Sequence, residues 1–141
     1  VEKIYPLLAR QIVDDYGITS GVCLDVGSGA GQVGIELAER TSLRVVLLDV
    51  NVEVLAVAKQ HARASAACDR VIPLRADVHR LPFAAGSVDL IVSRGSIFFW
   101  EDKPKGLREV YRILKPGGIA LVGGGAGRYL PARERERFVR K

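Results

Sequence analysis

The sequence predicts one α/β domain, a three-layer α/β/α sandwich built on a doubly wound parallel sheet. Short apolar runs rich in β-branched residues alternate with stretches of helical periodicity, and such runs are typical of parallel strands covered on both faces. The crossover connections of a parallel sheet are right-handed, which lays helices on both of its faces. The length of 141 residues suits a single domain spanning 1–141.

Helices and strands alternate from the first residues onward. Apolar side chains at four-residue spacing predict a helix over residues 7–16, with Gly17 as its stop. Two apolar runs about twenty residues apart, 22–26 and 45–49, predict the first two strands, and a helical face lies between them over about 31–40. The residues that set these helical faces are Leu8, Ile12, Tyr16, Val33, Leu37 and Ala38.

The next helix and strand follow the same rhythm. Asn51 is the predicted N-cap of the helix that comes after the second strand. The run 71–74 is the third strand, and Pro73 places it at a sheet edge because proline cannot donate to a ladder. The apolar positions of the helix are Val54, Leu55, Ala58 and Ala62.

Two more strands complete the alternation. The run 88–93 predicts the fourth strand, and Asp102 with Pro104 in the first turn starts the following helix. Residues 115–118, Lys-Pro-Gly-Gly, end that helix and lead into the fifth strand, 119–122. The expected apolar face of the helix is Leu107, Val110, Tyr111 and Leu114.

Composition and charge exclude several classes of protein. No apolar run approaches the roughly 18 residues of a membrane span, so a cytoplasmic protein without a membrane span is expected. Of the net charge of +5, a surplus of four comes from 128–141, which is predicted as a charged helical tail and not as a nucleic-acid surface. Cys23 and Cys68 are too few for a zinc pattern, and no metal is expected.

Polar residues follow the predicted strands where a ligand is expected. In doubly wound sheets, ligands bind beyond the carboxyl ends of the strands, where the strand order reverses. These ends carry Asp25, Asp49, Asp77 and Ser93 in the order of the strands. The loop 25–31 consists mostly of small residues, which let the backbone approach a ligand closely.

Two cofactors are compatible with this loop. Residues 29–34 spell G-x-G-x-x-G with Asp49 twenty residues after Gly29, as in nicotinamide-dinucleotide sites. Asp25 would oppose a pyrophosphate, however, and residues 18–39 contain no lysine or arginine. S-adenosylmethionine carries sulfonium and ammonium cations, and a charge pair at about 4 Å is worth on the order of 4 kcal/mol before desolvation. The acids favour S-adenosylmethionine, and an NAD(P)-dependent oxidoreductase stays an alternative.

Five motifs in order resemble those of class I S-adenosylmethionine-dependent methyltransferases. They are the acid and alternating glycines of 25–31, Asp49, the segment 77–83, the strand 87–93 and the turn 114–118. The chain is most similar to the small-molecule branch that contains the ubiquinone and menaquinone biosynthesis C-methyltransferases. The resemblance implies a Rossmann-like sheet of strand order 3-2-1-4-5. The cofactor residues it implies are Asp25, Gly27, Ser28, Gly29, Gly31, Asp49, Val50, Asp77, Val78 and Ser93.

Such a family transfers a methyl group from S-adenosylmethionine to a small molecule by in-line displacement, which needs orientation more than it needs a base. No general base is evident, and the catalytic residue is unknown. Substrate-pocket candidates are the N-terminal Tyr5 and, after the fourth strand, Arg94, Phe98 and Trp100. Packing on the next helix is an equal alternative for Phe98 and Phe99. His61 is expected on the surface. His79, two residues after Asp77, could reach the rim of the pocket, although a surface position is favoured.

The chain departs from the family pattern after its fifth strand. Class I enzymes usually add a sixth strand and an antiparallel seventh, for which no room is predicted here, so the fifth strand would be an open edge. A longer protein, a second copy of the chain, or the charged tail could cover it, and the first two are favoured. A catalytically silent cofactor-binding or assembly module is therefore an alternative to an enzyme.

Overall fold

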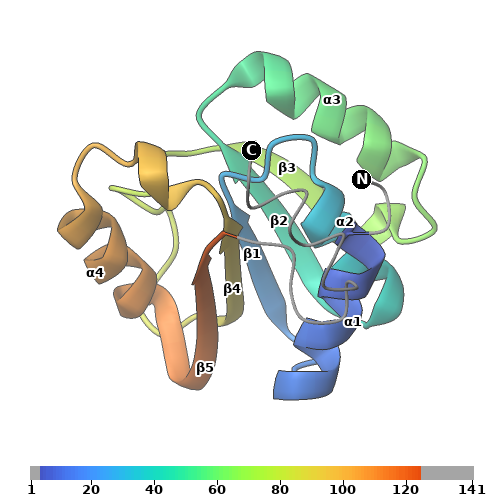
Figure 1. Ribbon diagram of the computed structural model, residues 1–141, viewed down its shortest axis with the longest axis horizontal. Coiled ribbons are helices and arrows are strands. Elements are labelled where there is room, and N and C mark those ends of the chain that lie inside the picture. The colour runs from blue at the N-terminus through green and yellow to red at the C-terminus, as the bar shows by residue number, and fades with distance from the viewer. Residues whose placement is uncertain (1–3, 125–141) are drawn as a thin grey trace, which may run out of the picture.

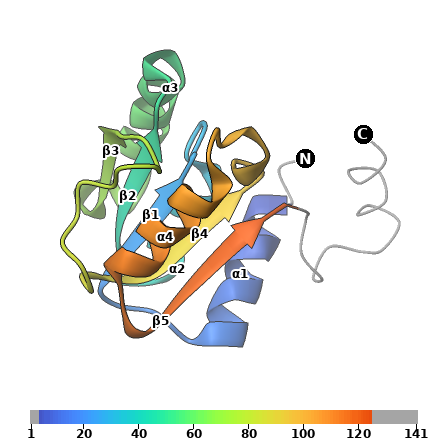
Figure 2. The ribbon, with the colours of Figure 1, turned by 90° about the vertical axis from the view of Figure 1, so that its left-hand side faces the viewer.

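The computed structural model describes residues 4–124 and shows a parallel sheet of five strands with helices on both faces. The strand order is β3-β2-β1-β4-β5, as predicted. Figure 1 shows α1, α2 and α3 on one face and α4 on the other, and Figure 2 shows α4 in front of the sheet. The bounds are α1 Ile4–Tyr16, β1 Val22–Val26, α2 Gln32–Arg40, β2 Arg44–Asp49, α3 Val52–Arg63, η1 Cys68–Arg70, β3 Val71–Arg75, β4 Val88–Arg94, η2 Ile97–Phe99, α4 Lys103–Ile113 and β5 Leu114–Gly123.

Two hydrophobic clusters hold the three layers together. One lies between the sheet and α1–α3 and includes Ala9, Leu37 and Ala58, none of which is exposed. The other lies between the sheet and α4 and includes Leu24 and Ile113. Both faces of the central strands are therefore covered, which explains why these strands are nearly continuous apolar runs.

Side-chain caps fix where α3 and α4 begin. Asn51 Oδ1 accepts hydrogen bonds from Glu53 N (2.9 Å) and Val54 N (3.2 Å), which confirms the predicted N-cap. Asp102 Oδ1 accepts from Lys105 N (3.1 Å) at the start of α4. The first turns of both helices therefore follow directly from loops at the carboxyl ends of the strands.

The predicted apolar face of α4 was partly wrong. Leu107 is 43% exposed and Tyr111 is 82% exposed. Gly106 is buried instead, because the Trp100 ring packs on it so closely that a Cβ there would lie 2.6 Å from a ring carbon. Glycine has no apolar side chain, so a search for apolar periodicity does not count it. The predicted buried face of α4 was therefore displaced from the observed one. The buried positions of α4 are Gly106, Val110 and Ile113.

The fifth strand begins earlier than predicted, at Leu114 instead of Ile119. Leu114 pairs with Val88, and the register shifts before Ile119 pairs with Leu90, so 115–118 form an irregularity within β5. The third strand lies at a sheet edge, as predicted. The other edge is β5. The expected helical tail, 128–141, lies outside the described residues. None of the helices in 4–124 is long and apolar enough to cross a membrane.

Candidate functional site

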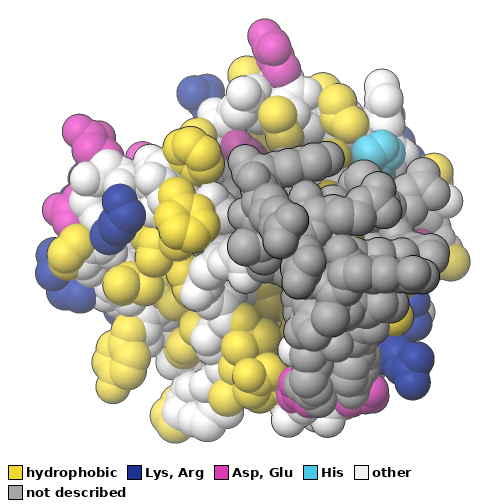
Figure 3. Space-filling view, in the orientation of Figure 1, with side chains coloured by type: hydrophobic (Ala, Val, Ile, Leu, Met, Phe, Trp, Pro, Cys, Tyr) yellow, Lys and Arg dark blue, Asp and Glu magenta, His cyan; other side chains and the backbone are white. Residues whose placement is uncertain are grey.

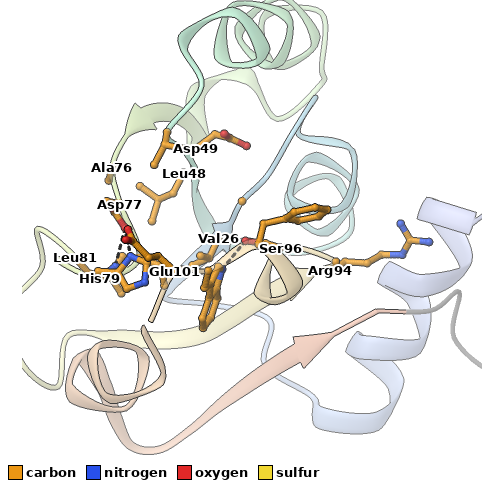
Figure 4. Close-up of a pocket in the computed structure, with 16 residues that line it drawn as sticks. Val26, Leu48, Asp49, Ala76, Asp77, His79, Leu81, Arg94, Ser96 and Glu101 are labelled. Atoms are coloured by element: carbon orange, nitrogen blue, oxygen red, sulfur yellow. Dashed lines mark hydrogen bonds and ion pairs between the residues drawn. The ribbon is translucent and has the colours of Figure 1, made fainter. Parts of the chain in front are cut away.

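Two cavities lie beside each other at the carboxyl ends of β1–β4. The main cavity, of about 490 Å³, is lined by residues that follow all four strands: 26–27, 48–50, 76–79, 81, 94–96 and 99–101. Figure 4 shows that these residues come from separate elements around the cavity. The glycine-loop cavity, of about 190 Å³, lies between α1 and the loop after β1, and shares Gly27 and Arg94 with the main cavity.

Glycines shape the loop between β1 and α2. Gly27 has φ +67°, and a Cβ there would collide with the Ser96 side chain. Gly31 has φ +83°, and a Cβ there would lie 2.7 Å from Leu47 Cδ1. Both positions thus require glycine for conformation and for space. Ser28 N donates to Leu48 O (2.8 Å), which ties the loop to the end of β2.

Asp25 is a buried carboxylate at the floor of the glycine-loop cavity. Its residue is 3% exposed, and Oδ2 accepts a hydrogen bond from Gly34 N at 3.0 Å. Burial raises the pKa of Asp25 to about 7; the Gly34 bond lowers this pKa and the charge of Asp49 raises it. A cation in the cavity would therefore stabilise the ionised form of Asp25.

Asp49 joins the glycine loop to the end of β2. Its Oδ2 accepts from Gly29 N (3.0 Å) and its Oδ1 accepts from Asn51 N (3.0 Å). Each carboxylate oxygen has capacity for a further hydrogen bond. Asp49 and Val50 both line the main cavity, so these carboxylate oxygens can accept from hydroxyl groups of a ligand there.

Asp77 and His79 form a hydrogen-bonded pair at the wall of the main cavity (Figure 4). Asp77 Oδ1 accepts from His79 N (2.9 Å) and lies 2.6 Å from His79 Nδ1. The backbone bond from His79 is the main reason that the pKa of Asp77 lies below its usual range. The His79 side chain is 18% exposed and borders the cavity, which is the alternative position at the rim of the pocket.

The segment after β4 supplies the remaining wall of the main cavity. Trp100 is 6% exposed, and its Nε1–H donates to Ser96 Oγ at 2.7 Å. Trp100 therefore both packs on α4 and lines the cavity. Phe98 and Phe99 are 64% and 88% exposed, so neither is buried against α4. Figure 3 shows hydrophobic side chains gathered over α4 and the segment before it.

Two of the predicted substrate-pocket residues, the cationic Arg94 and the aromatic Tyr5, lie close together at the border of the two cavities. The Arg94 guanidinium lies 5.9 Å from the centre of the Tyr5 ring. In Figure 4 the Arg94 side chain extends toward α1 and away from Asp77. Tyr5 lines the glycine-loop cavity and Arg94 lines both.

The structure brings most of the predicted site residues together. The main cavity takes Asp49, Val50, Asp77, Val78, Arg94 and Trp100, the glycine-loop cavity takes Tyr5, Asp25, Ser28 and Gly29, and Gly27 borders both. Gly31, Ser93 and Phe98 line neither cavity, and Ser93 Oγ donates to Val26 O (2.9 Å). The main cavity also takes Glu101, which was not among the predicted site residues, and His79, whose nearness to Asp77 indicated a place at the rim as an alternative. Among residues 4–124, no group of three or more His, Cys, Asp or Glu could hold a metal.

The backbone amides of the glycine loop bear on the dinucleotide alternative. A pyrophosphate would need free N–H groups at the start of α2. In this structure Gly29 N donates to Asp49, Gly31 N donates to Ser28 O (2.9 Å) and Gly34 N donates to Asp25. All three donors are already engaged, two of them by carboxylates, which disfavours a pyrophosphate at these amides.

Comparison with known proteins decides the family. The sequence profile described as "Methyltransferase domain" matches residues 24–122, which run from β1 to β5. The chain belongs to this methyltransferase family. This membership confirms the resemblance to class I S-adenosylmethionine-dependent methyltransferases that the five motifs predicted.

Several members of the family are similar over most of this chain. The ubiquinone/menaquinone biosynthesis C-methyltransferase UbiE of Geotalea daltonii is 36% identical over 105 residues, 73% of this chain and 45% of that protein. The chloroplastic 2-methyl-6-phytyl-1,4-hydroquinone methyltransferase 1 of Oryza sativa is 35% identical over 102 residues, 72% of this chain and 30% of that protein. The chain thus spans less than half the length of these curated relatives.

A solved structure agrees with the fold in detail. The crystal structure of a putative S-adenosyl-L-methionine-dependent methyltransferase from Methanococcus maripaludis superposes with a TM-score of 0.91 at 39% sequence identity. The match covers 98% of this chain and 62% of that one. The predicted Rossmann-like fold class is therefore confirmed.

Proposed function

We propose that the chain binds S-adenosylmethionine across the two cavities and transfers its methyl group to a small-molecule acceptor. The observation that carries this proposal is the placement of Asp25, Asp49 and Asp77. They lie at the carboxyl ends of three adjacent strands of the sheet and border two neighbouring cavities. An adenosyl group in the main cavity leaves its methionine end beside the glycine loop.

The charges suit each part of this cofactor. The ammonium of the methionine end belongs near Asp25, where it would compensate a buried carboxylate. The ribose hydroxyls can donate to Asp49, and the adenine amino group can donate to Asp77. Val50 and Val78 supply apolar surface for the adenine ring in the same cavity.

Methyl transfer needs an acceptor atom held in line behind the methyl carbon. The cofactor, when bound, supplies an electrophilic methyl group on a sulfonium. The chain's contribution is positioning and the exclusion of water, and orientation of this kind can supply roughly 7–11 kcal/mol of a barrier. Trp100, Phe99 and Arg94 border the cavity on the side where the acceptor would enter, and we assign no general base.

The acceptor is proposed to carry an aromatic ring. The names of the two curated relatives describe methylation in quinone biosynthesis and of a hydroquinone. Phe99 and Trp100 offer aromatic surface of the kind that stacks on such rings. Incubation with labelled S-adenosylmethionine and a panel of hydroquinones, phenols and amines tests this. Label in none of them, with intact cofactor binding, would favour the silent module.

Calorimetric titration with S-adenosylhomocysteine and with NADH tests the cofactor itself. Binding of S-adenosylhomocysteine, with no heat from NADH, is expected. Binding of NADH alone would overturn the proposal in favour of the oxidoreductase. Asp25→Asn serves as a matched variant, because it keeps an acceptor for Gly34 N while removing the charge opposite the ammonium.

The remaining proposals concern domain organisation, cellular location, ligand class and oligomeric state. We propose that 1–141 behaves as one domain in the cytoplasm, that it does not act on nucleic acid, and that a second copy covers the edge of β5. Within the described residues, β5 pairs only with β4. Light scattering at several concentrations checks the homodimer, and a monomer at all of them would contradict it.

A further inference from the structure

His79 makes hydrogen bonds in two directions that the proposed cofactor site does not itself account for. On one side its Nδ1 lies 2.6 Å from Asp77 Oδ1. On the other side Asp102 N donates to His79 Nε2 at 3.0 Å, across 23 residues of sequence. Asp102 caps α4, so the imidazole connects the loop after β3 to the start of that helix.

The two bonds together define which ring nitrogen carries the proton. Nε2 accepts from a backbone N–H, so it must be unprotonated. Nδ1 therefore carries the hydrogen and donates it to Asp77 Oδ1, which is the only arrangement of a neutral imidazole that satisfies both contacts. The bond from Asp102 N in turn favours the tautomer with its hydrogen on Nδ1.

We propose that His79 is a positioning residue for the adenine end of the cofactor, which fixes the Asp77 carboxylate so that its second oxygen accepts from the adenine amino group. Asp77 Oδ1 is engaged twice, by His79 N and His79 Nδ1. Oδ2 accepts no hydrogen bond from residues in the described range, and Asp77 borders the main cavity. This inference rests on the proposed cofactor, and it assigns His79 a role in discriminating adenine from other purines.

Two neighbouring observations support this role. The backbone and imidazole bonds from His79 both hold the pKa of Asp77 below its usual range, so the carboxylate is ionised and acts only as an acceptor. The Asp77 residue is otherwise open to solvent, with a side chain that is 59% exposed. Without the imidazole, only the bond from His79 N would hold this exposed carboxylate, so it would sample more rotamers and its affinity for one fixed donor would fall.

A matched pair of substitutions separates the two sides of the imidazole. His79→Asn places an amide nitrogen where Nδ1 stood and keeps a donor for Asp77, while it loses the acceptor for Asp102 N. His79→Gln reaches the position of Nε2 and keeps that acceptor, while it loses the donor for Asp77. His79→Ala removes both bonds, and thermal unfolding of each variant verifies that it is folded.

The test is the ratio of affinities for S-adenosylhomocysteine and S-inosylhomocysteine, in which a carbonyl replaces the adenine amino group. We expect wild type and His79→Asn to prefer the adenosyl ligand by at least about tenfold, the value of one hydrogen bond to a charged group. His79→Gln and His79→Ala should lose at least about threefold of this preference.

The outcomes are distinct. A preference unchanged in His79→Gln and His79→Ala would overturn the positioning role, and equal weakening of both ligands would reduce His79 to a structural residue. A wild-type protein that binds S-adenosylhomocysteine without preference would overturn the Asp77 assignment on which the role depends. Failure of wild type to bind either ligand would instead overturn the proposed function, and this inference with it.

Discussion

Asp25→Asn is expected to make the free energy of unfolding less dependent on pH, because Asp25 is buried with a pKa of about 7 against an ordinary value of 3.8. The folded protein therefore binds this proton more tightly than the unfolded chain does. Wild-type stability falls as the pH rises from about 4 to about 7 and is level above that range. The substituted amide oxygen can still accept from Gly34 N, and the amide does not titrate.

The size of the effect follows from the two pKa values of Asp25. Because the Asp25 carboxyl ionises more readily in the unfolded chain than in the fold, wild-type stability is lower than at acid pH by about 1.7 kcal/mol at pH 5 and by about 4 kcal/mol at pH 8. Stability of Asp25→Asn relative to wild type should thus increase by roughly 2.5 kcal/mol between pH 5 and pH 8. The unpaired amide N–H groups introduced by Asp25→Asn cost about 1–3 kcal/mol at every pH. This cost lowers the stability of the variant by a constant amount and does not change how the difference from wild type varies with pH.

Urea unfolding of both proteins at pH 5, 6, 7 and 8 measures this difference directly. Every other titrating group is present in both proteins and cancels in the comparison. Two stability curves that run parallel across this range would refute the reasoning. They would show that the pKa of the Asp25 carboxyl in the folded protein is the same as in the unfolded chain. The same variant should bind S-adenosylhomocysteine more weakly than wild type at pH 8, where wild-type Asp25 is charged.

Three further substitutions test separate parts of the site. Asp49→Ala should weaken S-adenosylhomocysteine binding at least about a hundredfold in calorimetry, through two lost hydrogen bonds to a charged group, and an unchanged affinity would show that the ribose lies elsewhere. Gly31→Ala should destabilise the domain by about 2–4 kcal/mol in urea unfolding, because of its positive φ and the contact with Leu47, and a neutral effect would contradict the packing of the loop. Trp100→Phe keeps an aromatic ring packed on α4 but loses the hydrogen bond to Ser96 Oγ, so the free energy of unfolding in urea should fall by about 1 kcal/mol. An unchanged free energy would show that the bond is not formed in solution.

Most of the fold was predictable because burial on both faces imposes a strong pattern on each central strand. The edge position of β3 followed from Pro73 alone, and the start of α3 followed from Asn51. On the buried face of α4, Val110 was predictable but Gly106 was not, since Gly106 is buried by the Trp100 ring and not by its own hydrophobicity. Sequence periodicity reflects only how hydrophobic each side chain is, while the burial of a residue depends also on which side chains pack against it.

Some residues of the candidate site could be placed from the sequence and others could not. Asp25, Asp49 and Asp77 could be placed from the sequence, because the carboxyl ends of neighbouring parallel strands meet at one edge of the sheet. The contact of His79 with Asp102 could not be predicted, because Asp102 is 23 residues away and contributes a backbone group that carries no sequence signal. Phe98 was preferred to Phe99 for the pocket, yet only Phe99 borders the main cavity, since a short 3₁₀ turn sets the direction of each ring.

A crystal structure of the chain with S-adenosylhomocysteine tests the central claim most directly. The account predicts adenine in the main cavity with its amino group at Asp77, ribose hydroxyls at Asp49, and the amino-acid end in the glycine-loop cavity above Asp25. Density for the ligand outside these two cavities, or with its adenine and amino-acid ends exchanged between them, would contradict it.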